Sequence, residues 1–227
     1  MKKLCLTIAI LLLLNMTVSA SEEEKIYRCV SNDHKMISLS FDDGPHPTET
    51  AKILSILRKY SIKATFFTVG KNAELYPDIL RQISDEGHEI GNHTFSHDLG
   101  KKSTSDTIKD ELKTNHEIIL KICENEPKLF RPPGGVLNQH TLKEAKEMGY
   151  KIVLWNVDTK DWMHRSADEI TETVLSDVKS GSIILMHDYI SGNTNTAEAL
   201  ERIIPLLLKE GYCFLTVGQL IQCNESL

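Results

Sequence analysis

The sequence predicts an α/β fold of alternating strands and helices in one domain. Two observations support this prediction: short apolar runs alternate with longer amphipathic segments, and no linker rich in proline or serine divides the chain. A chain of 227 residues with 41% hydrophobic content can bury one sizeable core. Alternating units of this kind form a parallel sheet with helices outside, either open and doubly wound or closed as a barrel. Both arrangements place their chemistry at the C-terminal ends of the strands.

The expected elements follow one another with short connections. Strands are expected at residues 36–41, 63–68, 88–92, 128–131, 150–157, 182–187 and 212–216. Helices are expected at residues 48–60, 75–87, 104–123, 138–148, 167–179 and 195–210. Gly87, Gly149 and Gly211 stand at or just after the ends of three of these helices, where a left-handed cap favours glycine.

The first strand ends in two adjacent carboxylates. A run of apolar residues at 36–41 is followed by Asp42, Asp43 and then a Gly-Pro pair that marks a turn. Two like charges at the end of a buried strand are costly unless a cation lies between them or they have different tasks. The alternative is that both carboxylates cap the next helix and face water.

Residues 1–20 have the pattern of a signal peptide. Two lysines stand near the start, an apolar run follows, and small residues lead up to Ala20. The apolar run is short for a membrane span, and an uncleaved anchor is the alternative. Residues 21–35 form a short charged lead-in to a domain expected at residues 36–222. The expected location is therefore outside the cell or in the cell envelope.

Four cysteines remain after this segment, namely Cys29, Cys123, Cys213 and Cys223. An even number in an oxidising compartment suits disulfides, and four cysteines allow three pairings. Cys29 and Cys223 lie near the two ends of the domain, so a disulfide between them could join the two ends (a Cys29–Cys223 clasp). The alternative is that some of the four cysteines are buried free thiols. A cysteine zinc site is not expected, because no Cys-x-x-Cys spacing occurs.

Two histidines follow the strand expected at 88–92. His93 and His97 lie on one side if their segment makes a helical turn, and this spacing suits a divalent metal such as zinc. A metal needs a third, anionic ligand, which the strand-end carboxylates supply. The alternative is a pair of surface histidines. Asn92 begins a glycosylation sequon, which we discount because a glycan would block the proposed site.

Three further strand ends carry polar residues. Arg131 precedes two prolines and two glycines, a backbone that can hold a guanidinium in a fixed place. The strand at 150–157 ends in an acidic loop with a tryptophan, 158–162, and His187 ends another apolar strand. Each has an ordinary alternative as a surface turn, an acidic loop or a structural histidine. Together with the carboxylates and the histidine pair they indicate a mononuclear metal hydrolase.

These five motifs, in this order, resemble those of the polysaccharide deacetylases of carbohydrate esterase family 4, the NodB-homology domain. The motifs are Ser40-Phe-Asp-Asp-Gly-Pro45, His93-Thr-Phe-Ser-His97, Arg131-Pro-Pro-Gly-Gly135, Asp158-Thr-Lys-Asp-Trp162 and Leu185-Met-His187. The resemblance extends from about Met36 to Leu220. It implies a distorted (β/α) barrel of seven to eight strand–helix units with the active site at the C-terminal strand ends.

The resemblance implies one divalent metal ion held by Asp43, His93 and His97. Zinc is the expected ion, and cobalt or nickel would also suit these ligands. Three protein ligands leave open positions for water and for a substrate carbonyl, as a catalytic site requires.

The resemblance also implies roles for the residues around the metal. Asp42 corresponds to a general base, and Arg131 to the residue that orients it. His187 corresponds to the general acid that protonates the leaving amine. Asp161 corresponds to the partner that raises the pKa of this histidine through its negative charge.

Three residues correspond to substrate contacts. Leu185 and Trp162 correspond to an apolar wall around the acetyl methyl group, and the metal together with a backbone N–H after the Arg131 motif corresponds to the groups that hold the oxyanion. Gly134 departs from the family pattern, because many members carry an aromatic residue there. The backbone donor is kept and a side-chain wall is lost, which bears on substrate preference.

The implied function is metal-dependent removal of N-acetyl groups from N-acetylglucosamine-containing polysaccharide, either peptidoglycan or chitin oligomers, with release of acetate. The alternatives are an O-acetyl xylan esterase of the same family, a deacetylase of the muramic-type sugar, and a catalytically silent glycan-binding relative. A net charge of −6 without a basic run argues against nucleic acid as the partner. No protein partner is implied, and a monomer is expected.

Overall fold

The structure is a computed structural model that describes residues 26–100, 103–192 and 194–225. The predicted signal peptide at residues 1–20 lies outside the described residues. None of the helices in the described part of the chain is both long and apolar enough to cross a membrane.

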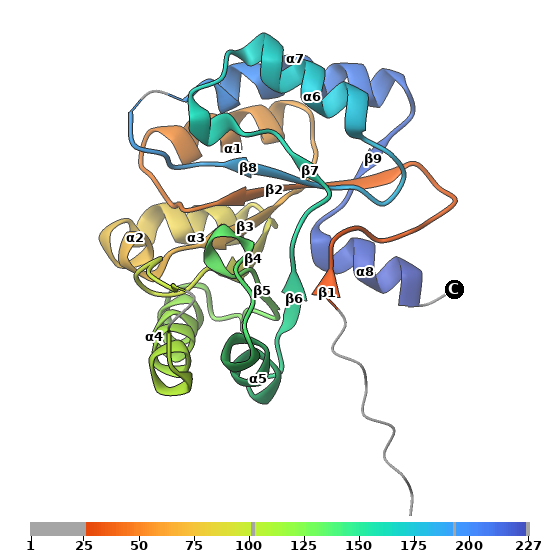
Figure 1. The fold of residues 1–227 in the computed structure, drawn as a ribbon. Helices are drawn as coiled ribbons and strands as arrows, with labels where there is room; N and C mark the ends of the chain where they lie inside the picture. The colour runs from red at the N-terminus through yellow and green to blue at the C-terminus, as the bar shows by residue number, and fades with distance from the viewer. Residues whose placement is uncertain (1–25, 101–102, 193, 226–227) are drawn as a thin grey trace, which may run out of the picture.

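The strands form one curled parallel sheet with helices around it, which confirms the predicted α/β barrel architecture (Figure 1). The described strands are β1 (Ile26–Tyr27), β2 (Met36–Asp42), β3 (Thr65–Thr68), β4 (Glu89–Asn92), β5 (Leu129–Phe130), β6 (Lys151–Val153), β7 (Val157–Asp158), β8 (Ile183–His187) and β9 (Cys213–Phe214). Their order across the sheet is β1-β6-β5-β4-β3-β2-β8-β7, and β9 pairs with β2. The central strand β2 is therefore flanked by β3 and β8.

The strand predicted at 150–157 is two strands in the structure. β6 pairs with β1 and β5, whereas β7 pairs with β8 at the other end of the strand order. Between them the N–H of Leu154 donates to the carbonyl of Tyr27, and the N–H of Asn156 donates to the carbonyl of Ile183. The chain thus crosses from one end of the curled sheet to the other, a change of partner that an apolar run does not reveal.

The helices match the predicted set with two additions. They are α1 (Glu49–Lys59), α2 (Gly70–Leu75), α3 (Pro77–Asp85), α4 (Ser105–Cys123), α5 (Gln139–Glu147), α6 (Ala167–Asp177), α7 (Thr196–Lys209) and α8 (Val217–Glu225), with single 3₁₀ turns η1 (Pro133–Gly135) and η2 (Asp161–Met163). Helices α2 and α8 were not predicted. The expected left-handed caps are confirmed, since Gly87, Gly149 and Gly211 all have positive φ.

Side-chain caps determine where three helices begin. The side chain of Thr104 accepts a hydrogen bond at the start of α4, and that of Asn138 does so at the start of α5. Ser166 and Glu169 form a reciprocal capping box at the start of α6. These caps satisfy backbone N–H groups that have no partner inside the helix.

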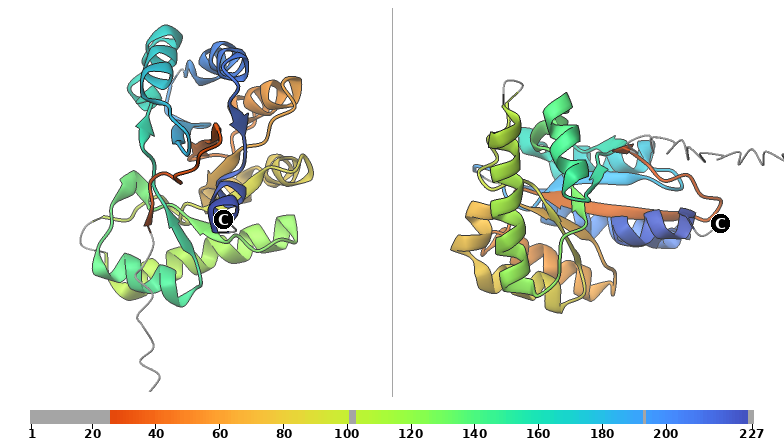
Figure 2. Two further views of the ribbon diagram at one scale, coloured as in Figure 1. Left: turned by 90° about the vertical axis from the view of Figure 1, so that its right-hand side faces the viewer. Right: turned by 90° about the horizontal axis from the view of Figure 1, so that it is seen from below.

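The core has an outer layer between sheet and helices and an inner layer inside the curled sheet. In the outer layer, apolar residues of β2, β3 and β8 pack against α1, α6 and α7. In the inner layer, residues of β3, β5, β6 and β8 pack against Val217, Leu220 and Ile221 of α8. Helix α8 lies near the centre of the ring of strands in the left view of Figure 2.

Helix α8 closes the N-terminal end of the barrel. The N–H of Val217 donates to the hydroxyl of Thr65, and the N–H of Gly218 donates to the carboxylate of Glu89. Thr65 and Glu89 are the first residues of β3 and β4. Because α8 covers this end, the opposite end, where the strands finish, is the place for a site.

The four described cysteines are free. The Cys29–Cys223 clasp considered from the sequence is not formed, and both residues are exposed. Cys123 is buried, and burial raises the pKa of its thiol to about 11. It therefore packs as a small apolar residue, as in the alternative reading of the sequence.

Candidate active site

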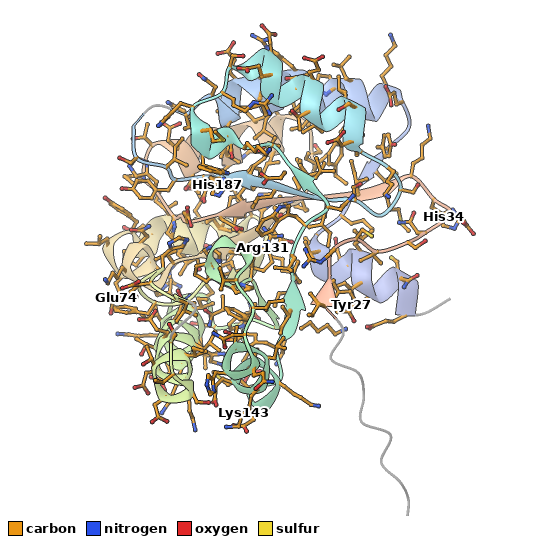
Figure 3. All side chains as sticks on the ribbon, viewed as in Figure 1. Tyr27, His34, Glu74, Arg131, Lys143 and His187 are labelled. Carbon is orange, nitrogen blue, oxygen red and sulfur yellow. The ribbon has the colours of Figure 1, made fainter. Side chains whose placement is uncertain are left out.

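The predicted site residues meet at the C-terminal ends of the strands. Asp42 ends β2 and lies directly opposite His187, which ends the neighbouring strand β8. Arg131 follows β5 and reaches Asp42 from the other side. Figure 3 labels Arg131 and His187 at this end of the sheet. Parallel pairing of the strands thus brings distant parts of the chain together.

Asp43, His93 and His97 form a group that could hold a metal ion. One ligand atom from each lies within 4.8 Å of the other two. The Oδ1 atom of Asp43 lies 3.4 Å from Nε2 of His93 and 3.2 Å from Nε2 of His97. This oxygen is buried and has no hydrogen-bond partner. A buried orphan oxygen between two imidazole nitrogens fits a divalent cation, for which these are suitable donors.

The charge and the backbone of this group also fit a cation. Burial alone would raise the pKa of Asp43, but the two imidazoles lower it below the ordinary value, so the carboxylate stays ionised. Asp43 and His97 both have positive φ, at 81° and 61°. Such conformations are strained for residues other than glycine and concentrate at functional sites.

His93 is oriented by the backbone of the neighbouring motif. Its Nδ1 lies 2.6 Å from the carbonyl oxygen of Arg131. A carbonyl only accepts, so Nδ1 carries the proton and donates it, which leaves Nε2 free to bind a metal. The Arg131 motif therefore supports the metal group through its main chain.

Asn92, just before His93, is part of a buried network. Its Oδ1 accepts from the N–H of Thr94 at 2.8 Å and from the amide of Asn115 at 3.0 Å. Its own amide donates to the carbonyl of Leu112 and to the hydroxyl of Tyr150. Asn92 is fully buried, so the structure agrees with discounting the sequon. Sequence reasoning missed Asn115, which is recognisable only as a polar position on the buried face of a helix.

Asp42 and Arg131 form a fully enclosed ion pair. The Nη1 of Arg131 donates to Oδ1 of Asp42 at 2.7 Å, and Nη2 donates to the carbonyl of Leu154 at 3.0 Å. The guanidinium lies 4.1 Å from the centre of the Phe67 ring. Burial lowers the pKa of Arg131, and the Asp42 charge counteracts this. The other oxygen of Asp42 lies 3.7 Å from Nε2 of His93 and so faces the metal group.

Asp161 and His187 form a second pair on the other side of the group. Nδ1 of His187 lies 2.7 Å from Oδ1 of Asp161. The second oxygen of Asp161 accepts from the N–H of His187 and from the hydroxyl of Thr196. Burial lowers the pKa of His187, but Asp161 and the nearby carboxylates raise it to about 9. His187 is therefore protonated at neutral pH in the metal-free chain.

Asp188 is a site residue that sequence reasoning missed. It is buried, accepts from the N–H of Gly44 at 2.8 Å and from the hydroxyl of Thr50 at 2.6 Å, and burial raises its pKa to about 7. Its own N–H donates to the carbonyl of Asp42. Asp188 thus fixes the turn that carries both carboxylates. Its position directly after His187 was the available signal.

The three predicted substrate-contact residues lie in different surroundings. Leu185 is buried in β8, and Trp162 on η2 is 51% exposed. Gly134 lies in η1 with φ of 60°, a left-handed conformation that suits glycine.

Comparisons with known proteins agree with this geometry. The polysaccharide deacetylase family model matches residues 30–153. A peptidoglycan-N-acetylglucosamine deacetylase of Bacillus cereus is 40% identical over 195 residues, which cover 85% of this chain and 91% of that protein. The Bc1960 peptidoglycan N-acetylglucosamine deacetylase, solved in complex with an N-hydroxybenzamide compound, has a TM-score of 0.84 at 39% identity, covering 87% of this chain and 92% of its own.

A third comparison bears on the metal. A family 4 acetyl xylan esterase from Clostridium thermocellum, solved in complex with a cobalt ion, has a TM-score of 0.78 at 33% identity and covers 83% of this chain and 91% of its own. The resemblance inferred from the five motifs is thus confirmed. The chain belongs to the polysaccharide deacetylase family, carbohydrate esterase family 4.

Proposed function

We propose that this protein removes N-acetyl groups from N-acetylglucosamine residues of peptidoglycan in a metal-dependent hydrolysis that releases acetate. The observation that carries the proposal is the Asp43–His93–His97 group, flanked by the Asp42–Arg131 and Asp161–His187 pairs. The peptidoglycan-N-acetylglucosamine deacetylase of Bacillus cereus, 40% identical, supports the choice of substrate.

In this proposal Asp43, His93 and His97 hold one divalent ion, with zinc as the first choice and cobalt or nickel as substitutes. Such an ion supplies Lewis acidity, which lowers the pKa of a water molecule and polarises a carbonyl group. Three protein ligands would leave room on such an ion for the water molecule and for the substrate carbonyl.

Asp42 accepts the proton of the attacking water. Its Oδ1 is occupied by Arg131, so Oδ2, which faces the metal group, is the atom that takes the proton. Arg131 donates to the carboxylate and holds it in place. The charge of Asp42 is thereby directed at the site where water reacts.

His187 delivers a proton to the leaving amine. Its Nδ1 is bound to Asp161, so Nε2 is the atom that faces the substrate. An amine leaves poorly unless it is protonated, which gives this separate acid a chemical purpose. Asp161 keeps the imidazole charged and correctly oriented.

The remaining predicted residues contact the acetyl group. Leu185 and Trp162 form the apolar wall for the methyl group, and the backbone N–H of Gly134, the first after the two prolines, donates to the developing oxyanion. Gly134 leaves the space beside this donor without a side chain, which admits a bulkier substituent on the sugar.

The test is acetate release by purified protein from peptidoglycan, chitin oligomers and acetylated xylan, with chelator, with zinc and with cobalt. We expect release from N-acetylglucosamine substrates that chelator abolishes and added metal restores. Asp42→Asn should bind metal but lose at least about 100-fold in turnover, since a general base contributes about 10²–10⁴-fold. Release from none of the substrates with either metal would refute the proposal.

The similar acetyl xylan esterase makes O-deacetylation of xylan the second candidate. Faster release from acetylated xylan than from peptidoglycan would select it. A catalytically silent relative is the third, but Asp42, Arg131 and His187 are all present.

The proposal also covers processing and domain limits. We infer cleavage after Ala20, secretion to the cell envelope, and a catalytic domain at residues 36–222 that acts as a monomer. Mass spectrometry of the secreted protein and its sedimentation check the cleavage site and the monomer.

A further inference from the structure

A pocket of about 260 Å³ opens beside the candidate metal group. Asp43 and His97 line it, together with Lys71, Asn72 and Tyr189. Helix α2, which carries Lys71, lies on the same side of the molecule as the C-terminal ends of β2 and β8 (Figure 1). A polysaccharide whose reacting sugar lies at the metal group can therefore extend a neighbouring sugar into this pocket.

The backbone at Lys71 is fixed to the loops of the metal group. The N–H of Lys71 donates to the carbonyl of Phe95 at 2.9 Å, within the loop between the two histidines. The side-chain amide of Asn72, the next residue, donates to the carbonyl of Asp43 at 2.7 Å. One main-chain and one side-chain hydrogen bond thus set where this part of α2 lies relative to the metal group.

The ammonium group of Lys71 has no carboxylate partner among the described residues. It lies over the ring of Phe95, 5.9 Å from the ring centre, and the side chain is exposed. The other charged groups that line the pocket, Asp43 and His97, belong to the metal group. The pocket therefore offers one uncommitted positive charge, in a chain whose net charge is −6.

An aromatic ring provides another wall of the pocket. Tyr189 is 39% exposed, and its ring stacks on that of His46 with centroids 5.1 Å apart and an interplanar angle of 21°. His46 also contacts the edge of Tyr76 and accepts the N–H of Glu49. Because the Tyr189 ring stacks on His46, it is held in place and offers a flat apolar face for a pyranose.

Resting on the proposed function, we propose that this pocket binds the sugar next to the reacting N-acetylglucosamine, and that Lys71 pairs with a carboxylate on that sugar. In peptidoglycan the neighbouring sugar carries a lactyl ether whose carboxyl group is free or bears a peptide with its own carboxylates. Every sugar of a chitin oligomer is neutral. Lys71 is therefore a specificity residue that selects peptidoglycan over chitin.

The experiment compares Lys71→Gln with the wild type on two tetrasaccharides of equal length. One is chitin tetramer, and the other is peptide-free peptidoglycan with free lactyl carboxylates. We expect kcat/KM on the acidic tetrasaccharide to fall about fivefold through KM, with the chitin tetramer changed less than about twofold. Lys71→Arg should keep the preference. Lys121→Gln, at an exposed lysine of α4, is the control and should behave like the wild type.

Two outcomes overturn the assignment while leaving the proposed function intact: equal losses on both substrates, or no loss on the acidic one. A wild type that releases acetate from neither tetrasaccharide refutes the proposed function instead. In that case the pairing is tested by calorimetry, which measures how tightly the zinc-loaded proteins bind the acidic tetrasaccharide. Binding about fivefold weaker in Lys71→Gln supports the pairing, and equal affinity overturns it.

Discussion

The candidate site centres on one oxygen atom that the protein leaves without a partner. Oδ1 of Asp43 is buried between the imidazoles of His93 and His97 and accepts no hydrogen bond. Buried polar atoms nearly always have a hydrogen-bond partner. An unsatisfied carboxylate oxygen beside two imidazole nitrogens therefore indicates a cation. The imidazole of His93 donates to the carbonyl of Arg131, and the N–H of Gly44, next to Asp43, donates to the carboxylate of Asp188, so both segments are held in place for it.

Loss of any ligand should remove the stabilisation that a metal gives. We expect zinc to raise the melting temperature of the wild type, because a ligand at 100 times its Kd stabilises by about 2.7 kcal/mol. Asp43→Ala, His93→Ala and His97→Ala should lose most of this rise. His34→Ala, an exposed histidine labelled far from the site in Figure 3, should retain it. An unchanged rise in all three ligand variants would rule out this ligand set.

Breaking the buried ion pair should be costly. Arg131→Met leaves the carboxylate of Asp42 buried and unpaired, which costs about 3–5 kcal/mol in the free energy of unfolding. Arg202→Met removes an exposed cation that pairs with Asp168 and Glu198, and should cost at most about 1 kcal/mol. Urea unfolding of both variants measures the difference.

The double variant Asp42→Asn with Arg131→Met isolates the charge. It should recover part of the loss, because no unpaired charge remains. A double variant that is as unstable as the sum of its parts would mean that Arg131 acts through packing alone.

At the scale of elements, α8 closes one end of the barrel so that the other can hold the site. Its residues Val217, Leu220 and Ile221 pack against the inner face of the strands. Its first turn is tied to Thr65 and Glu89 at the starts of two strands. This helix is therefore part of the core, although it comes last in the chain.

Truncation of the apolar face of α8 should destabilise the whole domain. Leu220 is fully buried, so Leu220→Ala should cost about 2–5 kcal/mol of unfolding free energy. Leu208→Ala, at a leucine of α7 that is 39% exposed, is the matched control and should cost much less. Similar midpoints for both variants in urea would show that α8 is not part of the cooperative core.

At the scale of the whole molecule, the charges at the site couple stability to pH. The pKa of His187 is raised to about 9, and the hydrogen bond to Asp43 also raises the pKa of His97. A histidine whose pKa is raised by folding binds its proton more tightly in the folded state. This contribution to stability is complete below the pKa of the unfolded chain, about 6.5, and is lost as the pH rises through about 9. The metal-free protein should therefore lose stability between pH 6.5 and 9.

Urea unfolding of the metal-free protein at pH 6.5 and 9 checks this expectation. The pKa shift of His187 from 6.5 to about 9 corresponds to a loss of about 3 kcal/mol in the free energy of unfolding over this interval. His187→Gln should show a smaller loss over the same interval. A free energy of unfolding that rises with pH would contradict the assignment of the raised pKa.

Much of the fold was predictable because its signals are local. The period of apolar residues indicated the helices, and glycines marked the ends of three of them. The division of 150–157 into β6 and β7 was not predictable, because the change of hydrogen-bond partner depends on the curl of the sheet. Helix α2 was missed because it is short, and Pro77 starts the longer α3 directly after it.

Inspection of the chain alone was enough to predict the residue types at the strand ends, their spacing and the family to which the chain belongs. The packing of the strands brings Arg131 and Asp42 together as a buried pair, lets Asp188 hold the turn that carries Asp43, and puts Lys71 at the pocket beside the metal group. The reason is physical. Strand ends are specified by neighbours in the chain, whereas parallel pairing brings together residues that are far apart in it.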